Sequence, residues 1–180
     1  MPCRNNRMPL FSGNPTKKEA FTLIELLLYI AILSTLAMVL ASFLPLVMEA
    51  RVKRKTIDEV ESQGAQAMTI MLQTIRNASG INSPATSTSA GTISLSMAST
   101  TLNPTVFDVS AGAIRIKEGT APAVSLTNHY VSTTALTFWN YSSTTQGMVT
   151  IRLDLAYATS SNLQRYQYQK MFYGSAAIRR

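Results

Sequence analysis

Apolar residues are concentrated near the amino terminus, where residues 26–48 contain no Asp, Glu, Lys or Arg. As a helix, these 23 residues measure about 34 Å, enough to cross the roughly 30 Å hydrocarbon core of a bilayer. A cleaved secretory signal has a shorter apolar region and a small-residue cleavage site after it, whereas Pro45, Glu49 and Arg51 end this run. The pattern therefore predicts a retained transmembrane helix. We expect a kink at Pro45, because proline lacks an amide donor and clashes with the preceding turn.

Beyond residue 48 the pattern becomes amphipathic. Apolar or small residues recur every three, four or five positions, which places them on one face of a helix. The members of this stripe are Val52, Ile57, Val60, Gly64, Met68, Met71, Leu72 and Ile75. Gly80 indicates the end of the helix, so the span and this segment are predicted to form one helix of about 55–60 residues. We expect the stripe to be buried under a sheet.

Residues 81–180 are rich in Ser, Thr, Ala and Gly, with short alternating runs typical of strands. The predicted strands are Thr92–Ala98, Thr105–Val109, Ala113–Lys117, Ala135–Tyr141, Gly147–Ala156 and Gln164–Phe172. No helical pattern separates them, so the sheet should be mostly antiparallel, and residues 82–91 are expected to be a linker. The predicted fold is α+β, with a long N-terminal helix packed on a mostly antiparallel β-sheet. The expected regions are a basic leader (1–20), a transmembrane helix half (21–48), an amphipathic helix half (49–80) and a β domain (81–180).

The charge and the reactive side chains give little support for catalysis or for nucleic-acid binding. The net charge is +7, but without residues 1–20 the chain has 12 basic and 8 acidic residues, a net +4, and no basic helix face or nucleic-acid module. The single cysteine, Cys3, lies in the leader, and the single histidine, His129, has no Cys, Asp or Glu nearby in sequence. Carboxylates are scattered, and no phosphate-binding loop is present. We therefore expect no enzyme activity, no cofactor, no metal site and no direct binding of nucleic acid.

The segment KKEAFTLIELLLYIAIL (17–33) resembles the N terminus of type IV prepilins and of type II secretion pseudopilins. The shared features are a basic leader, a small residue, Phe21, a Thr-Leu-Ile triplet, Glu25 and an apolar span. The resemblance implies that a prepilin peptidase cleaves between Ala20 and Phe21 and methylates the new amine of Phe21. The family usually has glycine before the cleavage point, and Ala20 has the next smallest side chain, so cleavage is still expected. Pro45 lies a few residues later than the proline of typical pilins.

Three further segments resemble J-type minor pseudopilins and related large minor pilins. They are TIRNASGI (74–81), LTFWNY (136–141) and YQKMFYGSAAIRR (168–180). The implied partners are prepilin peptidase, other pilin or pseudopilin subunits, and the lipid of the bacterial cytoplasmic membrane. Four Lys or Arg residues lie on each side of the span, so the positive-inside rule does not choose an orientation. The resemblance implies that the leader is cytoplasmic and that residues 49–180 are outside.

Glu25 places a carboxylate in the apolar run, where an ionised acid costs free energy unless a cation is close. Cleavage after Ala20 would create such a cation at the amine of Phe21, one helical turn from Glu25. The partner can be the amine of the same chain or that of a neighbour, and attraction is stronger between packed helices that exclude water. We therefore expect Glu25 to act in subunit assembly. The alternative is that its carboxylate reaches the lipid headgroups.

Two functions remain open from the sequence. The first is a structural subunit, a minor pilin or pseudopilin, of a type IV pilus-like or type II secretion filament. The second is a single-pass membrane protein whose β domain binds a ligand or a surface outside any filament.

Overall fold

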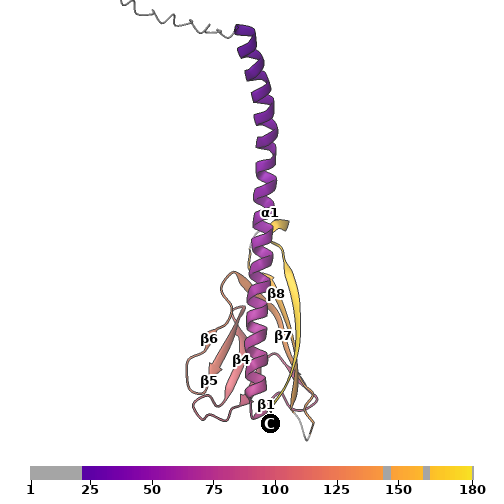
Figure 1. The fold of residues 1–180 in the computed structure, drawn as a ribbon. Coiled ribbons are helices and arrows are strands. Elements are labelled where there is room, and N and C mark those ends of the chain that lie inside the picture. The colour runs from indigo at the N-terminus through magenta and orange to yellow at the C-terminus, as the bar shows by residue number, and fades with distance from the viewer. Residues whose placement is uncertain (1–21, 144–146, 160–162, 180) are drawn as a thin grey trace, which may run out of the picture. The chain divides into compact units, whose positions relative to one another are not determined.

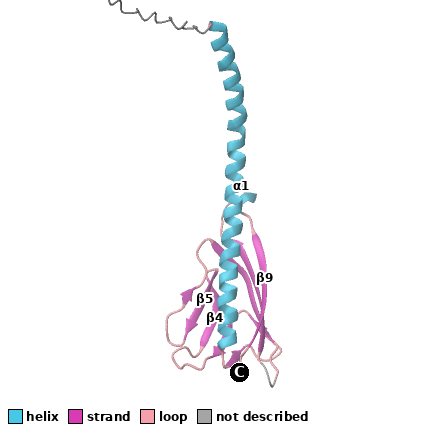
Figure 2. Cartoon of the chain, in the orientation of Figure 1, coloured by secondary structure: helices cyan, strands magenta, loops and turns pink. Residues whose placement is uncertain are grey.

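A computed structural model of the chain describes residues 22–143, 147–159 and 163–179. The chain divides into two units, Met1–Leu44 and Pro45–Arg180. One helix, α1 (Leu23–Asn77), contributes to both units, and the strands belong to the second unit (Figures 1 and 2). The fold is α+β, as the sequence predicts.

Helix α1 is 55 residues long, which confirms the predicted single long helix. Thr22 caps its amino terminus, because the Thr22 Oγ1 atom accepts a hydrogen bond from the backbone N–H of Glu25 at 3.3 Å. A threonine followed three residues later by a glutamate is the sequence pattern of a capping box. Pro45 lies inside α1, so the helix does not stop at the proline. The kink at Pro45 stays a prediction.

The strands form two antiparallel sheets rather than the single sheet that was predicted. One sheet has the order β1-β3-β4-β5-β6, and the other has the order β2-β7-β8-β9. The strands are β1 (Gly80–Ser83), β2 (Ser89–Ala90), β3 (Ile93–Ser96), β4 (Thr105–Ser110), β5 (Ala113–Glu118), β6 (Val124–Ser125), β7 (Val131–Asn140), β8 (Met148–Tyr157) and β9 (Gln169–Ala177). All pairs of neighbouring strands are antiparallel, which confirms the predicted strand direction.

Five of the six predicted strands correspond to β3, β4, β5, β7 and β8. The prediction of one strand over Gln164–Phe172 is wrong in its first half, where Gln164–Tyr166 forms a 3-10 turn, η1, and β9 begins only at Gln169. The prediction of a linker over residues 82–91 is also wrong at both ends. Asn82 and Ser83 belong to β1, and the two-residue strand β2 pairs with β7. Strands this short carry too few residues for an alternating pattern to be recognised.

The β4–β5 hairpin shows how local sequence sets the register of a sheet. Ser110 pairs with Ala113, so Ala111 and Gly112 form a two-residue loop, and both have positive φ, 51° and 78°. Positive φ at both loop positions is the geometry of a type I′ turn, whose twist matches that of the flanking strands. A side chain on Gly112 would also meet the Ser132 Oγ atom at 2.7 Å.

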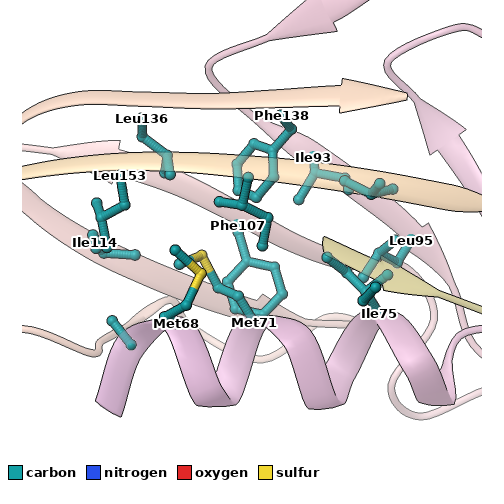
Figure 3. Close-up of a cluster of buried hydrophobic side chains, with 14 of the residues drawn as sticks. Met68, Met71, Ile75, Ile93, Leu95, Phe107, Ile114, Leu136, Phe138 and Leu153 are labelled. Atoms are coloured by element: carbon teal, nitrogen blue, oxygen red, sulfur yellow. The ribbon is translucent and has the colours of Figure 1, made fainter. Parts of the chain in front are cut away.

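The hydrophobic core lies between the second half of α1 and the two sheets. Figure 3 shows Met68, Met71 and Ile75 of α1 pointing toward Phe107 of β4 and toward residues of the other strands. The predicted stripe is confirmed, since most of its members are buried and Val52, Ile57 and Leu72 are half-buried. Thr56 and Ala67 are also buried and were not predicted. The buried apolar side chains from the strands are Ile93, Leu95, Phe107, Ile114, Val131, Leu136, Phe138, Val149, Ile151, Leu153, Leu155 and Ala176.

Two glycines allow α1 and β9 to approach closely. An added Cβ at Gly64 of α1 would overlap the ring of Phe172, and one at Gly174 of β9 would lie 3.0 Å from the Met68 sulfur and 3.1 Å from Leu72. Gly64 is buried in the predicted stripe. A larger residue at either position would therefore require the facing side chains, Phe172 or Met68 and Leu72, to move.

Candidate functional site

The candidate site in the first unit is the amino-terminal turn of α1, which contains Glu25. A carboxylate in the first turn is favoured by the unpaired amides and by the positive end of the helix dipole. The hydroxyl of Tyr29, one turn further along, donates a hydrogen bond to the Glu25 Oε1 atom at 3.2 Å. Glu25 is half-buried, whereas Thr22 and residues 26–50 are exposed. Sequence reasoning missed Tyr29, although its four-residue spacing from Glu25 is a signal for contact on one helix face.

Every residue of the apolar run from Leu26 to Met48 is exposed in the structure. Its large apolar side chains are between 49% and 79% exposed, and no described part of the chain covers them. Among the described residues, α1 is the one helix long and apolar enough to cross a membrane. An apolar surface of this extent needs lipid or other helices to cover it.

In the second unit, polar contacts join α1 to the strand-rich region. Glu61 Oε1 accepts hydrogen bonds from the Lys170 ammonium at 2.7 Å and from the Tyr168 hydroxyl at 3.0 Å. Two residues closer to the span, Glu59 Oε1 accepts a hydrogen bond from Asn128 Nδ2 at 2.6 Å. These partners lie 69 to 109 residues apart in sequence. The contacts therefore determine which part of α1 faces the loop before β7 and the start of β9.

The charges of these groups are coupled. The hydrogen bonds from Lys170 and Tyr168 hold the pKa of Glu61 below its ordinary value. The hydrogen bond to Glu61 raises the pKa of the Lys170 ammonium. Desolvation is the main reason that the pKa of Tyr168 is raised, and its hydrogen bond to Glu61 adds to this. The shifts of Glu61 and Lys170 both favour the charged forms that make up the ion pair.

The single histidine and the aspartates of the strands do not form a metal-binding cluster in the described part of the chain. His129 is exposed, and its ring centroid lies 4.0 Å from that of Tyr130. No group of three or more His, Cys, Asp and Glu side chains in the described part of the chain could hold a metal ion. Asp108 and Asp154 form ion pairs with Arg115 and Arg152, each at 2.7 Å.

Of the remaining predicted site residues, Pro45 is the one that the structure describes. Ala20 and Phe21 fall outside the described residues, and Pro45 lies twenty residues beyond Glu25 in the chain. Of the predicted site residues, the structure therefore shows the surroundings of Glu25 and the helical setting of Pro45.

A family model described as the prokaryotic N-terminal methylation motif matches residues 15–41. The chain carries this type IV prepilin-like motif. The match includes the Ala20–Phe21 junction, Glu25 and much of the apolar run, and it ends before Pro45. Comparisons with curated proteins and with solved structures gave no match. The resemblance to J-type minor pseudopilins therefore stays a prediction.

The motif and the exposed apolar helix indicate the same class of protein. Pilin-like proteins with this motif are structural and not enzymatic. The motif supports a precursor of the pilin or pseudopilin type, and the helix near the amino terminus is long and apolar enough to cross a membrane.

Proposed function

We propose that the chain is a minor pilin or pseudopilin, a structural subunit of a type IV pilus-like or type II secretion filament that waits in the bacterial cytoplasmic membrane before assembly. The supporting observation is that the methylation motif at residues 15–41 coincides with an apolar helix surface that the described chain leaves uncovered. Before assembly that surface is covered by lipid, and in a filament the same surface of neighbouring subunits covers it. The protein has no catalytic role in this proposal.

The motif supports the processing and the orientation that this proposal assigns to the chain. Residues 1–20 are a leader on the cytoplasmic side, and prepilin peptidase cleaves between Ala20 and Phe21 and methylates the amine of Phe21. Residues 21–48 form the membrane half of the mature helix, with a kink at Pro45. Residues 49–80 continue the helix outside, where the β domain, residues 81–180, packs on it.

Glu25 acts as the assembly residue in this proposal. The Glu25 carboxylate accepts one hydrogen bond from the Tyr29 hydroxyl. A carboxylate can accept several hydrogen bonds, so Glu25 can also accept one from an amine. The Tyr29 contact restrains the carboxylate rotamer at the edge of the apolar surface. When helices pack and water leaves, attraction between Glu25 and the Phe21 amine of a neighbour increases, because the local dielectric constant falls. The subunit is thereby held in register before it leaves the bilayer.

The test replaces the carboxylate and measures assembly separately from insertion. The Glu25→Gln variant should insert in the membrane and lose its leader normally, but should co-purify with partner subunits much less than the wild type. Glu49→Gln is the matched control, since it removes a carboxylate at the other end of the apolar run and should assemble normally. Normal co-assembly of Glu25→Gln would contradict the role of Glu25.

A binding role outside any filament would rest on the face of the second sheet that points away from α1. Met171 and Tyr173 are 54% and 64% exposed there, and the Arg152 Nη2 atom lies 3.6 Å from the Met171 sulfur. Tyr and Arg are common at the centres of binding surfaces. A filament subunit can also use this face for binding, so the face does not discriminate between a filament subunit and a binding protein outside any filament. Removal of the leader and methylation of Phe21, which are expected of the filament subunit, do discriminate between them.

A further inference from the structure

Four exposed basic residues lie between residues 51 and 55, shortly after the apolar run. They are Arg51, Lys53, Arg54 and Lys55, here named the basic cluster. We propose that the basic cluster, together with tyrosines of the strand-rich region, binds anionic phospholipid headgroups at the outer surface of the membrane. This inference rests on the proposed function in two respects, that residues 26–48 span the bilayer and that residues 49–180 lie outside.

The position of the basic cluster along α1 places it at the headgroups. At 1.5 Å per residue, Arg51 lies about 4 Å and Lys55 about 10 Å beyond Met48, the last residue of the apolar run. A headgroup layer is roughly 5–8 Å thick on each side of the hydrocarbon core. Lysine and arginine have long flexible stems, so even the Lys55 ammonium can reach back to this layer.

The acidic residues of the same helix do not cancel this charge. From residue 49 to 55 the only acid is Glu49, so this segment has a net charge of +3. The next acids, Asp58, Glu59 and Glu61, begin about 15 Å beyond Met48. Glu59 and Glu61 have partners in the strand-rich region, and one of them, Lys170, is a cation. The helix therefore has a net positive charge next to the membrane, and the acids other than Glu49 lie further out.

Three tyrosines lie at the same level of α1. Tyr130 and Tyr157 line one cavity together with Lys55 and Glu59. Tyr157 also stacks with Tyr166 of η1 at a centroid distance of 6.5 Å. Tyr130 is 48% exposed. Tyrosine combines an apolar ring with a polar hydroxyl, and it is enriched where proteins meet the headgroup region.

Charge complementarity and continuity with the apolar run make anionic lipid the occupant of this surface. Each lysine or arginine close to an anionic membrane strengthens binding by roughly fivefold. Removal of three charges should therefore weaken docking by roughly 100-fold. Because screening lengths shorten from about 10 Å at 0.1 M salt to about 3 Å at 1 M, docking should also be lost at high salt.

The experiment uses the full-length chain in purified vesicles. A Cys3→Ser, Leu163→Cys form has one cysteine, next to η1 on a side chain that is 50% exposed, and this cysteine carries a fluorophore. Vesicles contain phosphatidylcholine alone or an equimolar mixture with phosphatidylglycerol, and lipids with spin-labelled headgroups quench the fluorophore. We expect stronger quenching in the anionic vesicles, and we expect 1 M salt to remove the difference.

The variant with Lys53→Gln, Arg54→Gln and Lys55→Gln should lose the lipid-dependent quenching. Its control carries Arg76→Gln, Lys117→Gln and Arg179→Gln, which remove three exposed positive charges elsewhere and should leave quenching unchanged. Equal quenching in both kinds of vesicle, or in both triple variants, would overturn the proposed lipid-docking surface and would leave the proposed function untouched. A chain that does not float with either kind of vesicle would contradict the membrane span, and with it the proposed function.

Discussion

Replacing Gly64 by alanine probes how α1 packs on the second sheet. An added Cβ would lie 3.0 Å from the Phe172 Cδ2 atom and closer still to the Cε2 and Cζ atoms of the same ring. Carbon atoms in good contact are about 3.5–4.0 Å apart, so the ring would have to move by roughly 1 Å or more. Phe172 belongs to β9, whose backbone is paired with β8, which limits that movement.

Two opposing terms set the size of the effect. Overpacking of this kind typically costs about 1–3 kcal/mol. Alanine is a better helix former than glycine by about 0.8–1.0 kcal/mol. Gly64→Ala should therefore destabilise the wild-type protein by roughly 0–2 kcal/mol. In a Phe172→Ala background the overlap is gone, and the same Gly64→Ala change should instead stabilise by up to about 1 kcal/mol.

The assay is urea unfolding of the full-length chain in a nonionic detergent, for all four members of the double-mutant cycle. Trp139, the single tryptophan, lies in β7 and reports on the second sheet by its fluorescence. The expected result is a change of sign between the two backgrounds, with a coupling energy of about 1–3 kcal/mol. Equal stabilisation by Gly64→Ala in both backgrounds would refute the contact between Gly64 and Phe172, and with it the packing of α1 on β9.

Three further predictions concern the second unit. Because Lys170 lowers the pKa of Glu61, the ionised Glu61 stabilises the fold above its ordinary pKa of 4.5, and this stabilisation is lost as the pH falls below that value. In urea titrations, the free energy of unfolding should therefore decrease less on acidification in Glu61→Gln than in the wild type. Equal decreases would contradict the pairing of Glu61 with Lys170. Asn140 Nδ2 donates to the Pro84 carbonyl oxygen at 2.7 Å in a buried position, so Asn140→Ala should cost about 1–3 kcal/mol in the same titration, and a neutral result would exclude this contact. Removal of residues 1–48 should leave a folded, soluble fragment by circular dichroism and size-exclusion chromatography, whereas aggregation would show that the stripe on α1 faces other subunits.

The helix and most strands could be predicted because their signals are local. Periodicity identified the buried face of α1 from Val60 to Ile75, and strict alternation identified β8. Thr56 was missed because its side chain is polar, and Ala67 was missed because alanine is common on exposed as well as buried helix faces. The segment before β9 has the alternating pattern of a strand, yet Gln164–Tyr166 forms η1. A strand also needs a neighbouring strand with which to pair, and an alternating pattern does not show whether one is present.

The division into two sheets and the polar contacts of the helix could not be predicted in this way. Strand order depends on pairings such as β2 with β7, which lie about 50 residues apart and leave no local pattern. The Glu61–Lys170 contact spans 109 residues for the same reason. For the candidate site, the Glu25 carboxylate was predicted from its contrast with the apolar run. The Tyr29 hydroxyl that binds it was not predicted, because tyrosine in such a run reads as one more apolar residue.

The intact mass of the chain, purified from membranes of cells that contain a prepilin peptidase, tests the central claim most directly. A prepilin-type subunit loses residues 1–20 and gains one methyl group, and tandem fragmentation places that methyl on the amine of Phe21. An Ala20→Gly form should give the same product, and a bulky Ala20→Leu form should remain uncleaved. A wild-type chain that retains residues 1–20, or that is cut elsewhere and unmethylated, would contradict the proposal that this protein is a filament subunit.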